Sequence, residues 1–346
     1  MHTRAASWLR HRLGRAVVLS YALALILPAP GLWLRRPRPL PLPPTHLTLH
    51  TAPLLLSLVL FSAGLQVPVR ALGALLRRPK ALLAGLVLHL AIPLAVVPFV
   101  AFLLRRTPDT DGGSGLLTAM ILVVAMPVAA GATVWTDQGE GDQPTMVGLV
   151  LASTLLSPLT TPVLLATLSP LLSGGYAHTL AATGRLAQGG FALTAVVLPC
   201  AAGLLGALVL PARWLGRLVT TVTPSAMAGS LVLTYVNASG ALGSVLTRPR
   251  PLLFAAALAV AALVCLLSFI LGRVAAHLLR LEAATASSLT LACGMNNSSA
   301  SAVLITASLP DKPHLLLPVL AYGLLQKTAA NRIVTRLRPA PTAAGP

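Results

Sequence analysis

The stretch Ala292-Cys293-Gly294-Met295-Asn296-Asn297-Ser298-Ser299 interrupts a long apolar run with a glycine, two amides and two hydroxyls. In a lipid bilayer, every backbone N–H or C=O freed from a helix needs another partner, so such breaks persist only inside protein or beside a cavity. A second break, Pro127-Val128-Ala129-Ala130-Gly131, interrupts an earlier apolar run. Interrupted segments at matching positions in two halves of a chain are typical of the binding sites of secondary transporters.

The composition is that of a membrane protein. Charged residues make up 9% of the 346-residue chain and hydrophobic residues 56%, whereas soluble domains carry about 25% charged residues. The net charge of +18 would favour nucleic acid as the partner of a soluble chain. Here the arginines cluster between apolar runs, so we expect contacts with the lipid bilayer and no binding of nucleic acid.

The apolar runs predict an all-α protein, because runs of about 20 apolar residues are long enough to cross a bilayer. We place ten spans at residues 16–34, 47–66, 81–104, 115–136, 145–168, 188–210, 225–246, 252–278, 284–308 and 314–334. The basic residues before the first run resemble the start of a signal peptide. The run itself is long enough to span, so we count it as span 1.

Five spans followed by five predict an inverted repeat, which is common in secondary transporters. The first repeat covers residues 1–168 and the second covers residues 188–346, with a connector at 169–187 that we expect to form a short interfacial helix. The two breaks then fall in spans 4 and 9, at equivalent places in the two halves.

The lysines and arginines predict the orientation, because cytoplasmic loops carry an excess of them. With both termini in the cytoplasm, 16 fall nearer the cytoplasmic side and 9 nearer the outer side. The outer cluster of Arg35, Arg36 and Arg38 runs against this bias. We therefore expect a multi-pass protein of the plasma membrane with both termini in the cytoplasm.

No carboxylate lies deep in an apolar run; the seven are Asp109, Asp111, Asp137, Glu140, Asp142, Glu282 and Asp311. Ion-driven pumps often carry an intramembrane carboxylate. No zinc-protease, nucleophile-elbow or phosphate-loop motif occurs either. We expect no enzyme activity, no cofactor and no metal site. The turn from Asp137 to Asp142 could hold a hard cation, but a solvated turn is the favoured interpretation.

The two neighbouring amides are the leading candidates for binding. Asn296 and Asn297 each supply donors and an acceptor, Ser298 follows them, and Thr133 comes directly after the earlier break. Broken helices also expose N–H groups, which suit an anion, and C=O groups, which suit a cation. The alternative is that these side chains only hold neighbouring helices together by hydrogen bonds.

His89 lies near the middle of the third predicted span. Histidine titrates near physiological pH. His89 therefore either makes a hydrogen bond between helices or contacts the substrate and couples transport to protons.

Three stretches resemble the bile acid:sodium symporter family, within the wider group of bile acid, arsenite and riboflavin transporters. They are Ala63–Pro93, Pro127–Thr133 continuing into Ala152–Pro162, and Cys293–Ser299. The resemblance implies ten helices, divided into a panel domain of spans 1, 2, 6 and 7 and a core domain in which the broken spans 4 and 9 cross. It also implies an organic anion that moves together with sodium.

The sodium ligands that the resemblance implies are missing. Ala132 and Thr133 stand where the family has a Ser-Asn pair, and Met146 and Val150 stand where it has hydroxyl ligands. Ala292 replaces a glutamate that both family sodium sites share. Since Met, Val and Ala side chains offer no oxygen to a dehydrated sodium ion, we expect sodium coupling to be weakened or lost.

The resemblance therefore implies a secondary transporter of a small organic anion or amphipathic solute. His89 stands where the family has a glutamine and is the candidate for proton coupling. Two alternatives stay open: a membrane sensor that binds a ligand without transporting it, and a relative of the arsenite exporters, although span 4 offers no thiol.

Overall fold

The computed structural model describes residues 2–39, 48–67, 79–105, 113–247 and 251–337. These ranges are helical apart from connections and one antiparallel pair of two-residue strands, β1 (Arg38–Pro39) and β2 (Thr48–Leu49). The α-helices are α1 (His2–Ile26), α2 (Pro28–Arg35), α3 (Thr51–Leu65), α5 (Pro79–Leu104), α6 (Ser114–Val124), α7 (Ala132–Gln138), α8 (Gln143–Leu168), α9 (Gly175–Leu186), α10 (Leu198–Val209), α11 (Ala212–Thr247), α12 (Pro251–Leu278), α13 (Ala283–Gly294), α14 (Ser298–Ser308) and α15 (Leu316–Leu337). A π-helix (Ala187–Val197) precedes α10, and short 3-10 helices cover Ser169–Leu171 and Pro313–Leu315.

Five of these helices are long and apolar enough to cross a membrane, counted over the described ranges. A sixth is added if α1 and α2 form one bent span. The helices α3, α6 and α14 are apolar but shorter. The chain is therefore a multi-pass helical membrane protein.

The first predicted span is bent in the structure. α1 and α2 meet at a bend of 93°, because Pro28 has no N–H and disfavours helical backbone at Leu27, where φ is −132° and ψ is 72°. The Tyr235 hydroxyl donates to the Leu27 carbonyl at 2.6 Å and accepts from the Gly31 N–H at 3.2 Å. One side chain of α11 thus satisfies backbone groups on both sides of the corner.

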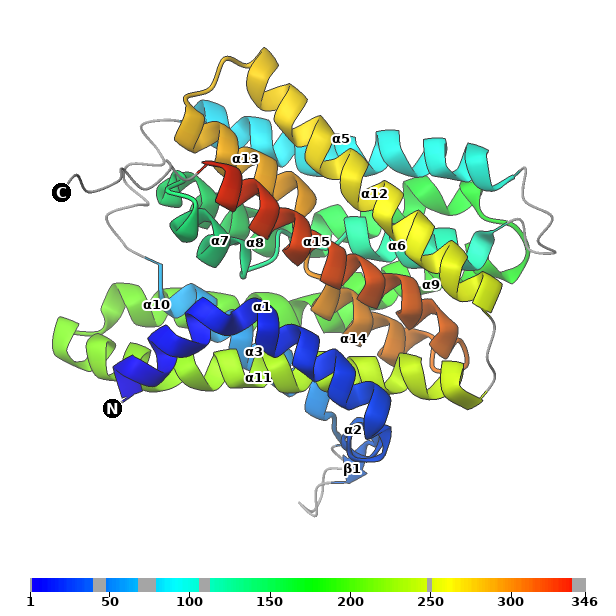
Figure 1. The fold of residues 1–346 in the computed structure, drawn as a ribbon, viewed down its shortest axis with the longest axis horizontal. Helices are drawn as coiled ribbons and strands as arrows, with labels where there is room; N and C mark the ends of the chain where they lie inside the picture. The colour runs from blue at the N-terminus through cyan, green and yellow to red at the C-terminus, as the bar shows by residue number, and fades with distance from the viewer. Residues whose placement is uncertain (1, 40–47, 68–78, 106–112, 248–250, 338–346) are drawn as a thin grey trace, which may run out of the picture.

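The helices form two groups that lie side by side in Figure 1. α1, α3, α10 and α11 pack on one another in the first group, and α5, α6, α7, α8, α12, α13 and α15 make up most of the second. In the first group, Gly64 of α3 lies directly against the Cys200 carbonyl, and Gly203 of α10 lies against the Phe61 carbonyl. Small residues at such crossings let helices approach closely in a membrane. The four helices of the first group overlap the predicted spans 1, 2, 6 and 7.

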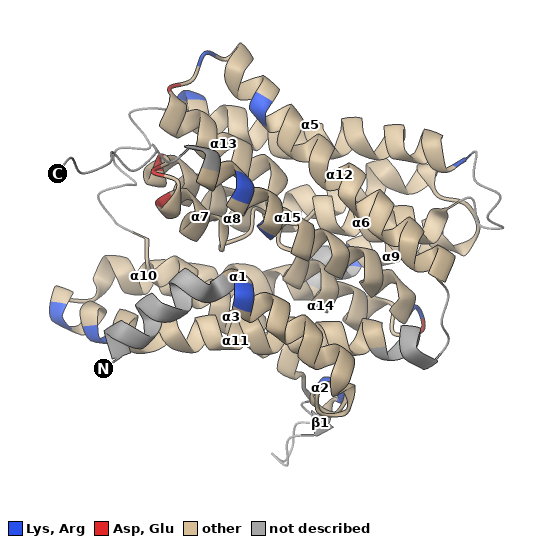
Figure 2. Cartoon of the chain, viewed as in Figure 1, with Lys and Arg blue, Asp and Glu red and all other residues tan. Residues whose placement is uncertain are grey.

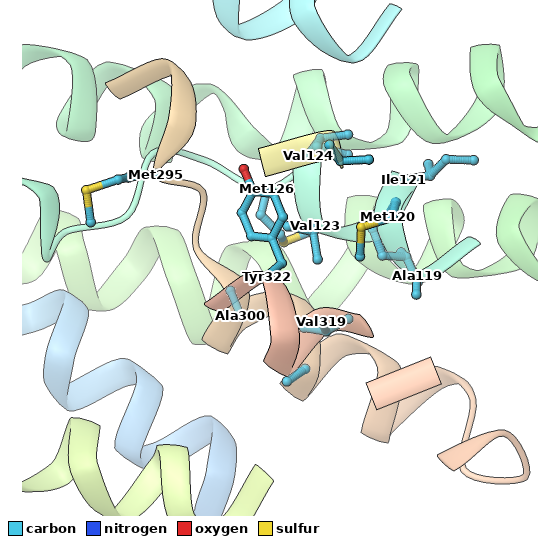
Figure 3. Close-up of a cluster of buried hydrophobic side chains, with 14 of the residues drawn as sticks. Ala119, Met120, Ile121, Val123, Val124, Met126, Met295, Ala300, Val319 and Tyr322 are labelled. Carbon is cyan, nitrogen blue, oxygen red and sulfur yellow. The ribbon is translucent and has the colours of Figure 1, made fainter. Parts of the chain in front are cut away.

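The second group has a tightly packed apolar centre (Figure 3). Met120 of α6 and Tyr322 of α15 are fully buried there. Figure 3 shows Tyr322 among Met126, Val123 and Ala300, beside the places where both broken helices are interrupted.

The connector predicted at 169–187 contains α9, whose Leu180 is fully buried. In Figure 2 the charged residues lie mainly near helix ends and in connections, and few lie in the middle of the helices. Asp109 and Asp111, most of the basic loop before Lys80, and Arg248 to Arg250 lie outside the described residues.

Candidate binding site at the helix crossing

Both predicted breaks are present, and they meet. α6 ends at Val124 and α7 begins at Ala132, while α13 ends at Gly294 and α14 begins at Ser298. Between these ends the two interrupted segments run antiparallel, with Val128 opposite Asn296. The Ala129 N–H donates to the Met295 carbonyl at 2.8 Å, and the Asn297 N–H donates to the Pro127 carbonyl at 2.9 Å. The breaks thus satisfy part of each other's backbone.

Side chains from other helices satisfy more of the interrupted backbone. Ser153 accepts a hydrogen bond from the Val128 N–H at 3.1 Å, and Thr161 donates one to the Ala125 carbonyl at 2.8 Å; both belong to α8. Tyr322 of α15 donates to the Gly294 carbonyl at 3.0 Å. Because no water is available deep in a bilayer, such partners are what permits a break there.

A cavity of about 450 Å³ lies beside the crossing, between the two helix groups. Its first wall comes from α1, α3 and α11, and its second from both breaks, α7, α8, α14 and α15. Asp137, at the end of α7, is exposed and marks the mouth. The N-terminal end of α1, α7 and the C-terminal end of α15 all lie at this end of the molecule (Figure 1).

The two predicted amides have different surroundings. The Asn296 amide nitrogen donates to the Tyr322 hydroxyl at 3.0 Å, so it is held inside the second group. The Asn297 side-chain oxygen accepts from the Ala300 N–H at 3.0 Å and caps α14. No hydrogen bond from the Asn297 amide nitrogen is found within the described ranges, and the residue lines the cavity. The structure therefore leaves Asn297 with a donor for a ligand.

Thr133 and Ser298 also line the cavity. The Thr133 hydroxyl donates to the Ala130 carbonyl at 2.8 Å. The Ser298 hydroxyl accepts from the Gln326 amide at 3.3 Å, while the Gln326 side-chain oxygen is buried without a partner. Four of the five predicted site residues, Asn296, Asn297, Thr133 and Ser298, thus surround one cavity.

His89 stands apart from the other four. It is 7% exposed, and its Nε2 atom has no hydrogen-bond partner. It lines a separate cavity of about 10 Å³ together with Cys293 and Asn296. Asn296 lines both cavities.

Lys327 of α15 lines the large cavity, and the sequence analysis did not single it out. Only its place within an apolar run signalled it, since a charge inside a span is costly and usually functional. Gln66 and Gln326 line the cavity as well and were missed for lack of any local pattern.

The acidic turn has a structural role at one of its positions. Asp142 caps α8 by accepting from the Thr145 N–H at 3.4 Å. It also accepts from the Thr145 hydroxyl at 2.7 Å and from the Thr285 hydroxyl at 3.2 Å. No group of three or more potential metal-binding side chains (His, Cys, Asp or Glu) occurs in the part of the chain that the structure describes. The three cysteines are free and buried.

Four of the five positions where sodium ligands were expected are apolar and packed, and the fifth, Thr133, carries a hydroxyl and lines the cavity. Ala132 and Met146 are fully buried, and Ala292 is 4% exposed. Val150 is also 4% exposed and presents its aliphatic side chain to the cavity wall.

Two crossed, broken helices beside a partly polar cavity are typical of the binding sites of secondary transporters. The chain belongs to the sodium bile acid symporter family, whose model matches residues 53–248, more than half of the sequence. Members of this family are transporters and not enzymes. The matched region includes His89, the first break and Thr133, whereas the second break and Lys327 lie beyond it. A comparison with curated proteins gives no match.

Proposed function

We propose that the protein is a secondary active transporter that moves a small organic anion or amphipathic solute by alternating access, with sodium coupling weakened or lost. The observation that carries this proposal is the cavity between the two helix groups at the crossing of the breaks. Its volume lies within the roughly 300–1,000 Å³ that is usual for small-molecule sites. Asn296, Asn297, Thr133 and Ser298 would contact the solute.

The proposal includes ten spans in an inverted repeat. α1 with α2, α3, α5, α6 with α7, and α8 would form the first five. The π-helix with α10, α11, α12, α13 with α14, and α15 would form the second five. In the orientation that the basic residues predict, the mouth beside Asp137 faces the cytoplasm. The described conformation is then open to the inside.

Contacts between the two helix groups support a closed outer side. Arg35 of α2 donates to the Thr306 hydroxyl of α14 at 3.1 Å. Tyr21 of α1 donates to the Leu320 carbonyl of α15 at 3.1 Å. The contact between α1 and α15 joins the first group to the second, and both contacts lie away from the mouth. Movement of the groups against each other would break them while closing the inner end.

The weakened sodium coupling rests on the four apolar side chains at the former ligand positions. A sodium ion needs several oxygen ligands, and Ala132, Met146, Val150 and Ala292 supply none from their side chains. His89 is the proposed proton-sensitive group, acting through Asn296 because it does not line the large cavity.

Counterflow in proteoliposomes tests the proposal. Proteoliposomes that contain the full chain would be loaded with one of a panel of unlabelled carboxylates and sulfonates, including cholate. Uptake of the same compound in labelled form would then be measured in sodium, potassium or choline buffer. We expect counterflow of at least one anion at a rate that does not depend on the cation. Binding without counterflow would instead identify a sensor, and a steep sodium dependence would refute the loss of coupling.

A matched pair of variants locates the pathway. Val59→Trp places a large ring on the cavity wall of α3, whereas Leu54→Trp places the same ring on an exposed position of that helix. Val59→Trp should abolish counterflow and Leu54→Trp should retain it. Equal rates in the two variants would show that the solute does not pass through this cavity.

A further inference from the structure

Lys327 is the one cation among the described residues that line the large cavity. Its side chain is half-buried, and neither a hydrogen bond nor an ion pair joins it to another residue in the described ranges. The one carboxylate in the same lining, Asp137, is exposed at the mouth. A charge inside a membrane protein is costly unless something compensates for it, so the described chain leaves Lys327 without its counter-ion.

The packing of α15 places Lys327 near the start of α14. Gly323, Gln326 and Lys327 are spaced i, i+3 and i+4, so they lie on one face of α15. A side chain at Gly323 would collide with Ser298, and Gln326 donates to the Ser298 hydroxyl at 3.3 Å. This face of α15 therefore lies against the first turn of α14, where the Asn297 amide also meets the cavity.

We propose that Lys327 binds the anionic group of the transported solute, a carboxylate or sulfonate, and so supplies the positive charge from within the protein. This inference rests on the proposed function and assigns the residue that binds the anionic group at that same site. The Asn297 amide nitrogen donates a second hydrogen bond to the same anionic group.

The rest of the cavity wall indicates the chemistry of the part of the solute that is not anionic. Val59, Leu151 and Met227 contribute apolar wall on both sides. Apolar walls with a few convergent polar groups are characteristic of sites for small amphipathic molecules. The solute thus carries one anionic group, held by Lys327 and Asn297, on a largely apolar body.

The test measures binding to the purified full chain in nanodiscs by isothermal titration. The probes are cholate with its uncharged amide, and naphthalene-2-sulfonate with its uncharged sulfonamide. We expect the wild type to bind at least one anion more tightly than its neutral partner. Lys327→Gln should weaken binding of that anion about 10- to 150-fold, the range for a hydrogen bond to a charged group, and leave binding of the neutral probe unchanged.

Three further variants control for folding and for charge. Lys327→Met removes the charge with a side chain of similar length and should give the same loss as Lys327→Gln. Arg332→Gln removes an exposed charge from the same helix, outside the cavity, and should change nothing. Asp137→Asn removes a charge that repels the anion and should leave its affinity equal or higher.

Several results would overturn the assignment. These are equal binding of the anion and its neutral partner by the wild type, no binding of any anion, or full affinity in both Lys327 variants. A loss in Asp137→Asn as large as in Lys327→Gln would show that the two side chains pair with each other. Anion binding that depends on Lys327 without counterflow would refute transport and retain this inference, whereas counterflow that is indifferent to Lys327 would do the reverse.

Discussion

The substitution Asn297→Asp separates the two roles that the structure gives to this residue. Its side-chain oxygen caps α14 through the Ala300 N–H, and its amide nitrogen is left for a ligand. Aspartate keeps an oxygen for the cap, and Asp and Asn are about equally good at this position. A carboxylate at a helix N-terminus is also favoured by the helix dipole. The substitution therefore changes only the amide N–H donor that is left for the ligand, which becomes a negatively charged carboxylate oxygen.

The expected magnitudes differ between folding and binding. Loss of the cap in Asn297→Ala should lower the free energy of unfolding by about 0.5–2 kcal/mol, whereas Asn297→Asp should stay close to the wild type. For the anion, loss of a hydrogen bond to a charged group is worth about 1.5–3 kcal/mol, or roughly 10- to 150-fold in Kd. Repulsion by the new carboxylate, and its neutralisation of Lys327, add to this loss.

Two measurements on the same purified samples decide the outcome. Thermal unfolding should rank the wild type and Asn297→Asp together and above Asn297→Ala. Titration with the anion that the wild type binds best should rank the wild type far above both variants. An Asn297→Asp protein that binds the anion as tightly as the wild type would remove Asn297 from the site. One that unfolds as readily as Asn297→Ala would refute the cap.

Other predictions address the surroundings of the cavity. Tyr322→Phe leaves the Asn296 amide and the Gly294 carbonyl without their partner and should destabilise the protein by about 1–3 kcal/mol per unsatisfied group, as measured by unfolding in detergent against the wild type. His89→Gln should retain binding but flatten the dependence of initial uptake on pH, because an imidazole can titrate and an amide cannot; identical profiles would leave His89 a packing residue. Arg35→Ala removes the contact with Thr306 and should increase labelling of an engineered cavity cysteine from the outer side, and unchanged labelling would argue against an outer closure.

The sequence predicted the breaks because their cause is local. Pro127 and the Gly294 to Ser299 stretch contain residues that are unfavourable in a helix interior, and the structure breaks both helices there. The bend at Leu27 was equally local, since Pro28 and Pro30 follow it, but the length of the apolar run obscured it. The family was also accessible from short motifs, and the match over residues 53–248 confirms it.

The different roles of the two amides were not accessible from the sequence. Asn296 and Asn297 are adjacent and chemically identical, so no local pattern distinguishes them. Their roles differ because Tyr322, 26 residues beyond Asn296, lies beside one of them and not the other. Lys327 was hidden for the same reason: its importance comes from the cavity that it lines, which α1, α3 and α11 complete from distant parts of the chain.

The backbone at the crossing explains why recognition falls to side chains. The sequence suggested that freed N–H and C=O groups would face the ligand, yet several of these groups are occupied. The Ala129 and Asn297 N–H groups bind carbonyls of the opposite break, and the Val128 N–H binds Ser153. These contacts fix the crossing whatever solute is present. Side chains such as Lys327 can then select solutes by charge without disturbing the backbone contacts at the crossing. In the proposed mechanism, the positive charge that balances the anion is Lys327 of the protein and not a co-transported sodium ion.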